Sequence, residues 1–318
     1  MERFVELRHL VKEFKPSGLR RLTGSAVRAV DDVSLTINRG SVFGLVGESG
    51  CGKTTLSRSL LYLDPPTSGE VVVKDTPLHT LSRKKLREFR SVMQIVFQDP
   101  NGALNPKMNI ASSLKEGLIN RGINRRERDD RIDDLLQQVG IAPTVKKRYP
   151  HEFSGGQKQR IVVARALTME PEFLVLDEPV SNLDVSIQAQ IINLFLDLKE
   201  TFSLTYLFIS HDLNLVSFLC DHIAVMYNGR IMEKAPAEEL TKNPLHPYTR
   251  RLYSSVPGIH RMPAFSEAIL SDADQRLTDF SQSCLYYPIC PIRSEDCLEG
   301  RPELEDKGGG HYVACIHS

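Results

Sequence analysis

A glycine-rich loop near the start of the chain has the residue types and spacing that bind phosphate groups. Segment 47–55 reads GESGCGKTT and fits the pattern G-x-x-x-x-G-K followed by Ser or Thr, directly after the apolar run Val42 to Val46. Glycines let backbone amides converge on phosphate oxygens, and a helix that begins at Lys53 adds the positive end of its dipole. A glycine-rich turn that fits the pattern by chance would lack this strand-loop-helix arrangement. We expect Lys53 to contact the β- and γ-phosphates of a nucleotide and Thr54 to coordinate Mg²⁺. The predicted nucleotide-binding residues are Gly47, Glu48, Ser49, Gly50, Cys51, Gly52, Lys53, Thr54 and Thr55.

Two adjacent acids, Asp177 and Glu178, follow the apolar run Phe173 to Leu176. A buried parallel strand delivers such residues to the edge of the sheet where ligands bind. Asp177 would then hold Mg²⁺ through its water shell, while Glu178 would polarise the attacking water as general base. An isolated Asp-Glu pair can also be a solvated turn, so its interpretation depends on the motifs around it.

Four further motifs lie in a fixed order around these acids. They read VFQDP at 96–100, FSGGQKQR at 153–160, SNLD at 181–184 and ISHD at 209–212. Segment 153–160 resembles the signature motif of ATP-binding cassette (ABC) proteins, and the other three match further motifs of that family in the same order. The resemblance implies an ATP-hydrolysing enzyme that uses ATP and Mg²⁺.

The signature motif has a physical role of its own. Ser154 and the amides of Gly155 and Gly156, followed by Gln157, would form a second anion-binding site at a helix amino terminus. In the family this site faces the ATP of the opposite subunit, so that two cassettes enclose two nucleotides. The resemblance therefore implies dimerisation on ATP binding, with Asp184 touching the opposing site.

The resemblance also assigns roles to three dispersed residues. His211 would hold the γ-phosphate and orient the lytic water, although a lone histidine is more often structural. Gln98 would sense the γ-phosphate and coordinate Mg²⁺, and it would lie where a helical subdomain joins the core. Phe14 would stack on adenine, although it could equally be a core residue of an edge strand.

The elements expected to position these residues follow an α/β pattern. Short β-branched runs alternate with helical stretches, which indicates a largely parallel sheet. The expected strands are 42–46, 71–73, 92–97, 173–176, 206–210 and 223–227. Segment 4–37 is more typical of antiparallel strands, and strand signals vanish between Ala111 and Leu167.

Together with the resemblance, this pattern predicts a RecA-like P-loop NTPase core with an antiparallel β subdomain and a helical signature subdomain at about 105–167. The regular alternation stops after segment 243–248. We therefore expect an ATP-binding cassette over residues 1–250 and a small cysteine-bearing extension over 251–318.

Composition narrows the classes of partner. The 318 residues include 40 Lys plus Arg and 40 Asp plus Glu, so the chain lacks the basic field of nucleic-acid binders, and no nucleic-acid partner is expected. Its apolar runs are far shorter than the roughly 20 residues of a membrane-spanning helix. Charges at Glu2, Arg3 and Glu6 disfavour a signal peptide. We expect a cytosolic chain whose membrane channel is made by other chains.

Four of the six cysteines crowd the last part of the chain, at Cys284, Cys290, Cys297 and Cys315. Clustered thiols in a reducing compartment more often indicate metal or redox chemistry than disulfides. The spacings are irregular rather than paired C-x-x-C, which disfavours a zinc ribbon, and soft thiolates suit a 4Fe-4S cluster, as the resemblance implies. Zinc and free structural thiols remain the alternatives.

Within the family, the chain is most similar to ATPase subunits of dipeptide and oligopeptide importers, a subfamily that includes nickel importers. Segments 46–53, 99–106 and 243–249 and the cysteine-bearing tail carry this resemblance. It implies a second ABC ATPase subunit, expected to be a paralogous chain, two permease subunits and an extracytoplasmic substrate-binding protein. The chain would then lie peripherally on the cytoplasmic face of a prokaryotic membrane and energise peptide uptake.

Three alternatives differ in function. Uptake of nickel or another small solute would use the same subfamily architecture. A soluble ABC ATPase of DNA repair or translation typically has two cassettes, a coiled coil or zinc modules, none of which is evident here. A non-enzymatic cassette would have lost the base or the lysine, whereas Glu178 and Lys53 are both present.

Overall fold

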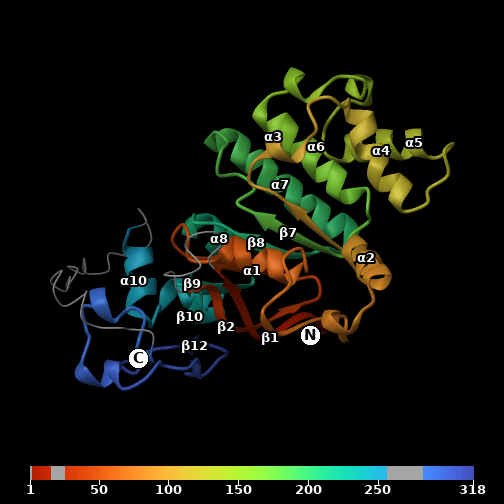
Figure 1. Ribbon diagram of the computed structural model, residues 1–318. Helices are drawn as coiled ribbons and strands as arrows, with labels where there is room; N and C mark the ends of the chain where they lie inside the picture. The colour runs from red at the N-terminus through yellow and green to blue at the C-terminus, as the bar shows by residue number, and fades with distance from the viewer. Residues whose placement is uncertain (1, 16–25, 256–281) are drawn as a thin grey trace. The chain divides into compact units, whose positions relative to one another are not determined.

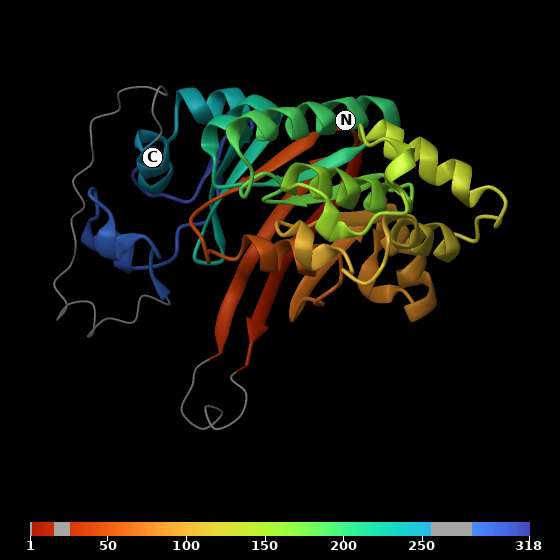
Figure 2. The ribbon, with the colours of Figure 1, turned by 90° about the horizontal axis from the view of Figure 1, so that it is seen from above.

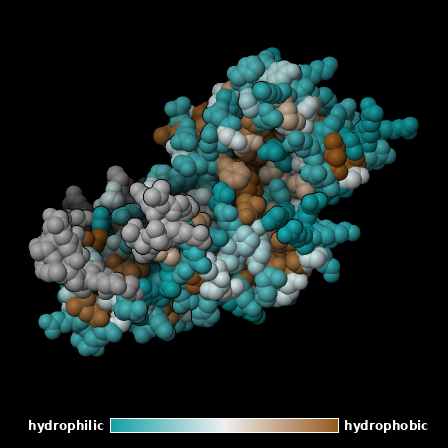
Figure 3. Space-filling view, in the orientation of Figure 1, coloured by the Kyte–Doolittle hydropathy of each residue, from teal (hydrophilic) through white to brown (hydrophobic). Residues whose placement is uncertain are grey.

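The computed structural model describes residues 2–15, 26–255 and 282–318. The chain divides into two compact units, which are described separately. Unit 1 comprises Met1–Phe4, Ile37–Ser41 and Lys74–Ile209, and unit 2 comprises Val5–Thr36, Val42–Val73 and Ser210–Ser318. On the face shown in Figure 3, hydrophilic residues predominate and apolar residues gather in small patches.

Unit 1 is built on three parallel strands in the order β8-β7-β6. These are β6 (Met93–Val96), β7 (Phe173–Asp177) and β8 (Thr205–Ile209). Every residue of β7 and β8 is buried, as expected of parallel strands covered on both faces. The register pairs Val175 with both Ile95 and Leu207, so the strands end together.

The helices of unit 1 include a group that lies side by side in Figure 1, formed by α4, α5 and α6, which contact one another pairwise. The helices are α2 (Arg83–Val92), α3 (Pro100–Ala103), α4 (Ile110–Asn120), α5 (Arg128–Gln138), α6 (Gly155–Leu167) and α7 (Val185–Phe202). Strand β5 (Thr76–Pro77) also belongs to this unit. The apolar faces of α4 and α5 supply the core of the group, with Leu114 and Leu136 fully buried.

Unit 2 contains a sheet in the order β11-β12-β10-β9-β3. Its strands are β3 (Val42–Val46), β9 (His222–Tyr227), β10 (Arg230–Pro236), β11 (Glu305–Asp306) and β12 (Tyr312–Val313). Strand β3 runs parallel to β9, and the remaining neighbours are antiparallel. The carboxyl-terminal strands therefore extend the sheet that carries β3.

Among its described residues, unit 2 also contains a long-stranded antiparallel sheet and several α-helices. Strands β1 (Arg3–Phe14) and β2 (Val27–Asn38) lie side by side in Figure 2, and β4 (Ser68–Val73) pairs antiparallel with β1. The helices are α1 (Lys53–Leu60), α8 (Leu213–Leu219), α9 (Ala237–Lys242) and α10 (Pro247–Ser254). Across the described parts of the chain, no helix combines the length and apolar character that crossing a membrane requires.

Candidate functional site

The glycine-rich loop connects the buried strand β3 to helix α1 in unit 2. Two of its glycines are required by close backbone contacts. A Cβ at Gly47, where φ is 151°, would lie 2.2 Å from the Met226 carbonyl oxygen, and one at Gly52, where φ is 111°, would lie 2.1 Å from that of Ala29. Any larger residue would push the loop away from these neighbours.

Lys53 lies inside this loop and is buried. Its ammonium group donates to the carbonyl oxygens of Gly47, at 2.7 Å, and Glu48, at 2.9 Å. The Lys53 Nζ is also 3.7 Å from the Cys51 Sγ, whose pKa is raised above its ordinary value by burial. A phosphate group entering the loop can replace these carbonyls as the partner of the ammonium group. Thr54 follows on α1 with an exposed side chain.

Asp177 and Glu178 follow each other at the carboxyl end of β7 in unit 1. Asp177 is buried, whereas Glu178 is partly exposed and has a left-handed backbone with φ 48°. Its N–H donates to the Ile209 carbonyl at 2.9 Å, at the end of the neighbouring strand β8. The end of the sheet therefore fixes the backbone of Glu178.

Gln98 lies next to Glu178, although 80 residues separate them in sequence. The Gln98 amide nitrogen donates to Glu178 Oε2 at 3.0 Å and to Ser181 Oγ at 3.2 Å. The Ser181 hydroxyl in turn donates to the Glu178 carbonyl at 3.1 Å. These three residues form one hydrogen-bonded group that can orient a carboxylate toward a water molecule.

Ser181 was not assigned a role from the sequence. It belongs to segment 181–184, and its position three residues after Glu178 on the same turn was the signal that could have identified it. Asp184 closes this segment as the N-cap of α7 and is exposed, with no side-chain capping bond.

The signature segment forms the amino terminus of α6. The Ser154 hydroxyl accepts from the Gln157 N–H at 3.4 Å, and the Gln157 side chain accepts from the Ser154 N–H at 3.1 Å, which together make a capping box. Ser154, Gly155 and Gln157 are exposed. A Cβ at Gly156 would lie 2.6 Å from Ile187 Cγ2. The exposed amino terminus of this helix can receive an anion from outside the chain.

His211 and the start of the glycine-rich loop line the same pocket in unit 2. Its volume is ≈ 310 Å³, and its walls include Gly47, Glu48, His211, Leu213 and Arg251. His211 is exposed and precedes Asp212, which caps α8 by accepting from the Leu215 N–H at 3.2 Å. The structure thus places the histidine beside the loop that is expected to bind phosphate.

Phe14 ends strand β1 and is 45% exposed, so its ring is not part of the core. The Lys12 ammonium group lies 5.4 Å from the centroid of this ring. An exposed aromatic ring with a cation on one side leaves a face on which a planar base can stack.

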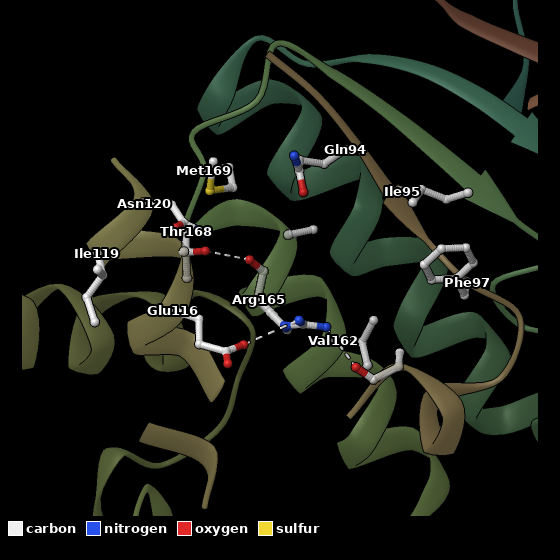
Figure 4. A pocket seen from close by; sticks show the side chains of 13 residues that line it. Gln94, Ile95, Phe97, Glu116, Ile119, Asn120, Val162, Arg165, Thr168 and Met169 are labelled. Carbon is white, nitrogen blue, oxygen red and sulfur yellow. Dashed lines mark hydrogen bonds and ion pairs between the residues drawn. The ribbon is translucent and has the colours of Figure 1, made fainter. Parts of the chain in front are cut away.

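A larger pocket of ≈ 600 Å³ lies in unit 1 between β6, α4 and α6 (Figure 4). Its lining includes Phe97 and Ile119, which are 39% and 49% exposed, and Phe97 directly precedes Gln98. Arg165 lines the pocket, donates to the Ala103 carbonyl at 2.7 Å and lies 3.6 Å from the Glu116 carboxylate. The pocket therefore combines an apolar surface with a charged rim.

The four carboxyl-terminal cysteines are free thiols in unit 2. Cys284, Cys290 and Cys297 are buried and Cys315 is partly exposed. The Cys284 N–H donates to the Cys297 carbonyl at 3.1 Å, and burial raises the pKa of Cys290 to about 11. Within residues 2–15, 26–255 and 282–318, no group of three or more His, Cys, Asp or Glu side chains is arranged to hold a metal ion. The geometry does not support metal binding at these thiols, and the iron–sulfur cluster stays a prediction.

Comparisons with known families identify two matching segments. The ABC transporter family matches residues 30–181, and the family described as Oligopeptide/dipeptide transporter, C-terminal region, matches residues 232–297. The second match begins in β10 and extends into the cysteine-bearing tail.

Curated relatives match the chain over almost its whole length. Oligopeptide transport ATP-binding protein AppF of Bacillus subtilis is 44% identical and is aligned over 99% of this chain and 97% of its own. Oligopeptide transport ATP-binding protein OppF of the same species is 50% identical over 100% and 97% of the two chains. Di/tripeptide transport ATP-binding protein DppF of Pseudomonas aeruginosa is 41% identical over 100% and 98%.

Solved structures agree with the fold. The cbiO1 protein of Clostridium perfringens, described as part of an ABC transporter complex, superposes with a TM-score of 0.67 at 28% identity, over 76% of this chain and 92% of that one. The bacterial ABC transporter cassette MJ0796 gives 0.64 at 26% identity, over 73% and 98%. The resemblance inferred from the motifs is therefore confirmed, with an ABC ATPase fold of mixed sheets and helices. The chain belongs to the ABC transporter ATPase family, in the group that carries the oligopeptide/dipeptide transporter C-terminal region.

Proposed function

We propose that this chain hydrolyses ATP to energise the uptake of dipeptides or oligopeptides through separate membrane permeases. The proposal rests on the sequence identity of 41% to 50% with peptide-transport ATP-binding proteins. This match extends through both the cassette motifs and the cysteine-bearing tail. All side chains needed for hydrolysis are present in the sequence, including Lys53, Glu178 and His211.

The amides of residues 47–55 and the Lys53 ammonium group bind the β- and γ-phosphates, as Lys53 exchanges its bonds to Gly47 and Glu48 for phosphate oxygens. Thr54, Asp177 and Gln98 would hold Mg²⁺, which neutralises charge on the phosphates when bound. The exposed ring of Phe14 stacks on adenine. These contacts fix the γ-phosphate in position for attack.

Glu178 accepts a proton from the attacking water as it approaches the γ-phosphate. The Gln98 amide holds the carboxylate through its 3.0 Å bond, and His211 steadies the γ-phosphate and orients the water. Within unit 1, the bonds from Gln98 and Ser181 hold Glu178 at the end of β7, so its carboxylate needs little reorganisation at the moment of reaction.

A second cassette completes each site. Ser154, Gly155, Gly156 and Gln157 present their exposed helix terminus to the γ-phosphate bound by that cassette, with Asp184 beside it. Because one chain offers both a phosphate loop and this second anion site, two cassettes arranged head to tail enclose two ATP molecules. The partner cassette is a paralogous chain.

The pocket beside Gln98 is the docking site for a permease (Figure 4). Its exposed apolar residues, Phe97 and Ile119, suit a segment with an apolar face, and Arg165 and Glu116 suit a polar rim. The chain then lies peripherally on the cytoplasmic face of the membrane. Two permeases and an extracytoplasmic substrate-binding protein complete the importer.

The transport proposal is tested with the chain reconstituted in vesicles together with the membrane proteins that co-purify with it and their binding protein. ATP-dependent uptake of labelled dipeptides and oligopeptides is expected, and it should be absent when the chain carries Glu178→Gln. If the vesicles take up Ni²⁺ but no peptide, the assigned function changes from peptide import to metal import. Hydrolysis with no co-purifying membrane protein would indicate a cassette ATPase outside transport.

For the tail, we infer that Cys284, Cys290, Cys297 and Cys315 ligate a 4Fe-4S cluster. The donor set is four thiols and contains no carboxylate, which suits iron–sulfur ligation. A bound cluster would link the chain segments that carry its ligands. Iron and sulfide assays with visible absorbance on anaerobically purified chain test this, and absence of iron from such a sample would refute it.

A further inference from the structure

The C-terminal module, defined as residues 282–318, packs in unit 2 against the elements that surround the phosphate loop. Strand β12 pairs with β10, and the buried His311 lies 2.6 Å from the buried Glu233 carboxylate. These contacts attach the module to the sheet that carries the loop. Two further series of contacts connect the module to the phosphate loop through intermediate residues.

The first connection is aromatic. Tyr286 of the module is buried, with its ring centroid 5.5 Å from that of Tyr248 and 5.4 Å from that of Tyr227. Tyr248 on α10 is fully buried, and its hydroxyl accepts from the Glu48 N–H at 3.0 Å. Glu48 is the second residue of the phosphate loop. The module therefore packs directly against the residue that holds one side of this loop.

The second connection runs through charge and backbone. Arg301 of the module donates to the buried Asp31 carboxylate on β2. The Asp31 N–H donates to the Gly229 carbonyl at 2.9 Å, and the Gly229 N–H donates to the Cys51 carbonyl at 2.8 Å. Cys51 is the fifth residue of the loop, so the two connections reach it at separate points.

We propose that the C-terminal module positions the phosphate loop for ATP, with Tyr248, Tyr286 and Arg301 as positioning residues. Glycines give this loop conformational freedom that must be lost when its amides converge on phosphate. Contacts that hold the loop at Glu48 and at Cys51 before ATP arrives reduce that loss, so ATP binds more tightly. The inference rests on the ATP binding of the proposed function and assigns the module a part in it.

The sharpest test of the aromatic connection is Tyr248→Phe, which removes the hydroxyl but keeps the ring. The matched control is Tyr253→Phe on the same helix, because the Tyr253 hydroxyl is also buried but lies 3.2 Å from the Ser217 hydroxyl instead of the loop. The dissociation constant for MgATP is measured on the full chain, beside the melting temperature. We expect the dissociation constant to rise about three- to ten-fold for Tyr248→Phe, because one hydrogen bond is lost, and to stay unchanged for Tyr253→Phe.

The charge connection is tested with Arg301→Gln and with Arg301→Lys, which keeps a cation for Asp31. The control is Lys307→Gln, since Lys307 belongs to the same module and pairs with Glu305 at 3.1 Å. We expect weaker MgATP binding for Arg301→Gln, recovery for Arg301→Lys and no change for Lys307→Gln. Tyr286→Leu, which keeps apolar volume, should weaken binding in the same direction.

The outcomes separate this inference from the proposed function. If the wild-type chain does not bind MgATP, the proposed function fails and the inference with it. If the wild type binds and Tyr248→Phe and Arg301→Gln bind equally well, the inference alone fails. Equal weakening by Tyr253→Phe and Lys307→Gln would also overturn it, because the effect would then follow general stability and not the loop.

Discussion

Glu178 combines chemical and conformational features that mark a functional residue. Its left-handed backbone, with φ 48°, is uncommon for a residue with a side chain, and such strain persists where neighbouring structure enforces it. Here the bond from its N–H to Ile209 and the contacts from Gln98 and Ser181 to its side chain and carbonyl supply that enforcement. The carboxylate is thus held in one orientation before any water arrives.

The first prediction concerns Glu178→Gln. The amide cannot accept the proton of the attacking water, so we expect ATP turnover to fall by about 10²- to 10⁴-fold while MgATP binding is kept. The variant should also accumulate as an ATP-dependent dimer, detectable by size-exclusion chromatography. Glu200→Gln is the matched control, because Glu200 is an exposed carboxylate on α7. Wild-type turnover in Glu178→Gln would reject this residue as the base.

A second prediction at this scale concerns Ser181. Ser181→Ala removes the hydroxyl that accepts from Gln98 and donates to the Glu178 carbonyl, while leaving both of those residues in place. We expect kcat to fall about three- to ten-fold with little change in KM for ATP, because the lost bond orients the base and does not touch the nucleotide. Ser203→Ala, at the end of α7, serves as control. A change in KM with an unaltered kcat would contradict this role.

At the scale of elements, the sequence was most informative where the pattern is local. The expected strands 42–46 and 173–176 correspond to β3 and β7, because continuous apolar runs bounded by polar turns specify buried parallel strands. Strands β11 and β12 have two residues each, and they form because β12 pairs with β10 and β11 pairs with β12. Their existence depends on partners far away in sequence, which no local periodicity can reveal.

The pairing of β12 with β10 leads to a pH prediction. The hydrogen bond to Glu233 raises the pKa of His311 above its ordinary value, and Glu239 lies 3.8 Å from the other ring nitrogen. A histidine whose pKa is raised in the folded state contributes its full stabilisation at pH values below its ordinary pKa of about 6.5. That contribution is lost as the pH rises through the raised pKa of the folded state. The attachment of the module should therefore weaken from mildly acidic to alkaline pH.

This dependence is measured by comparing wild type with His311→Gln. At pH near 6, the free energy of unfolding of the wild type should exceed that of His311→Gln by about 1.5 to 3 kcal/mol, as expected for a buried hydrogen bond between charged groups. This difference should shrink as the pH rises. Chemical unfolding gives the free energy, and hydrogen exchange at Tyr312 and Val313 shows whether the change occurs in β12. His151→Gln, an exposed histidine in unit 1, is the control. A difference that grows with pH would contradict the assignment.

At the scale of the whole molecule, the candidate site could be predicted because its residues lie in short motifs of fixed order. Gln98 and Glu178 are hydrogen-bonded across 80 residues, and only the resemblance to a known family connects them before the structure is seen. Tyr248 lies in a segment that indicated the subfamily but carried no chemical signal. Its contact with Glu48 arises from packing between α10 and the loop, which composition and spacing do not encode.

The last prediction concerns how the cassette is coupled to a membrane partner. Ile119→Glu places a charge at the pocket beside Gln98, in a position that is already 49% exposed, so the fold should tolerate it. Basal ATP hydrolysis by the chain alone should stay unchanged, because Ile119 makes none of the contacts of the catalytic group. Co-purification with permeases and their stimulation of hydrolysis should fall at least about ten-fold, since a buried unpaired charge at an interface costs several kcal/mol.

Phe218→Glu provides the matched control for this experiment. Phe218 is 77% exposed on α8 and does not line the pocket, so it tests whether any new surface charge disturbs assembly. Permease binding retained by Phe218→Glu and lost by Ile119→Glu would assign docking to the pocket in unit 1. If Ile119→Glu still couples hydrolysis to the permeases, the docking surface lies outside this pocket.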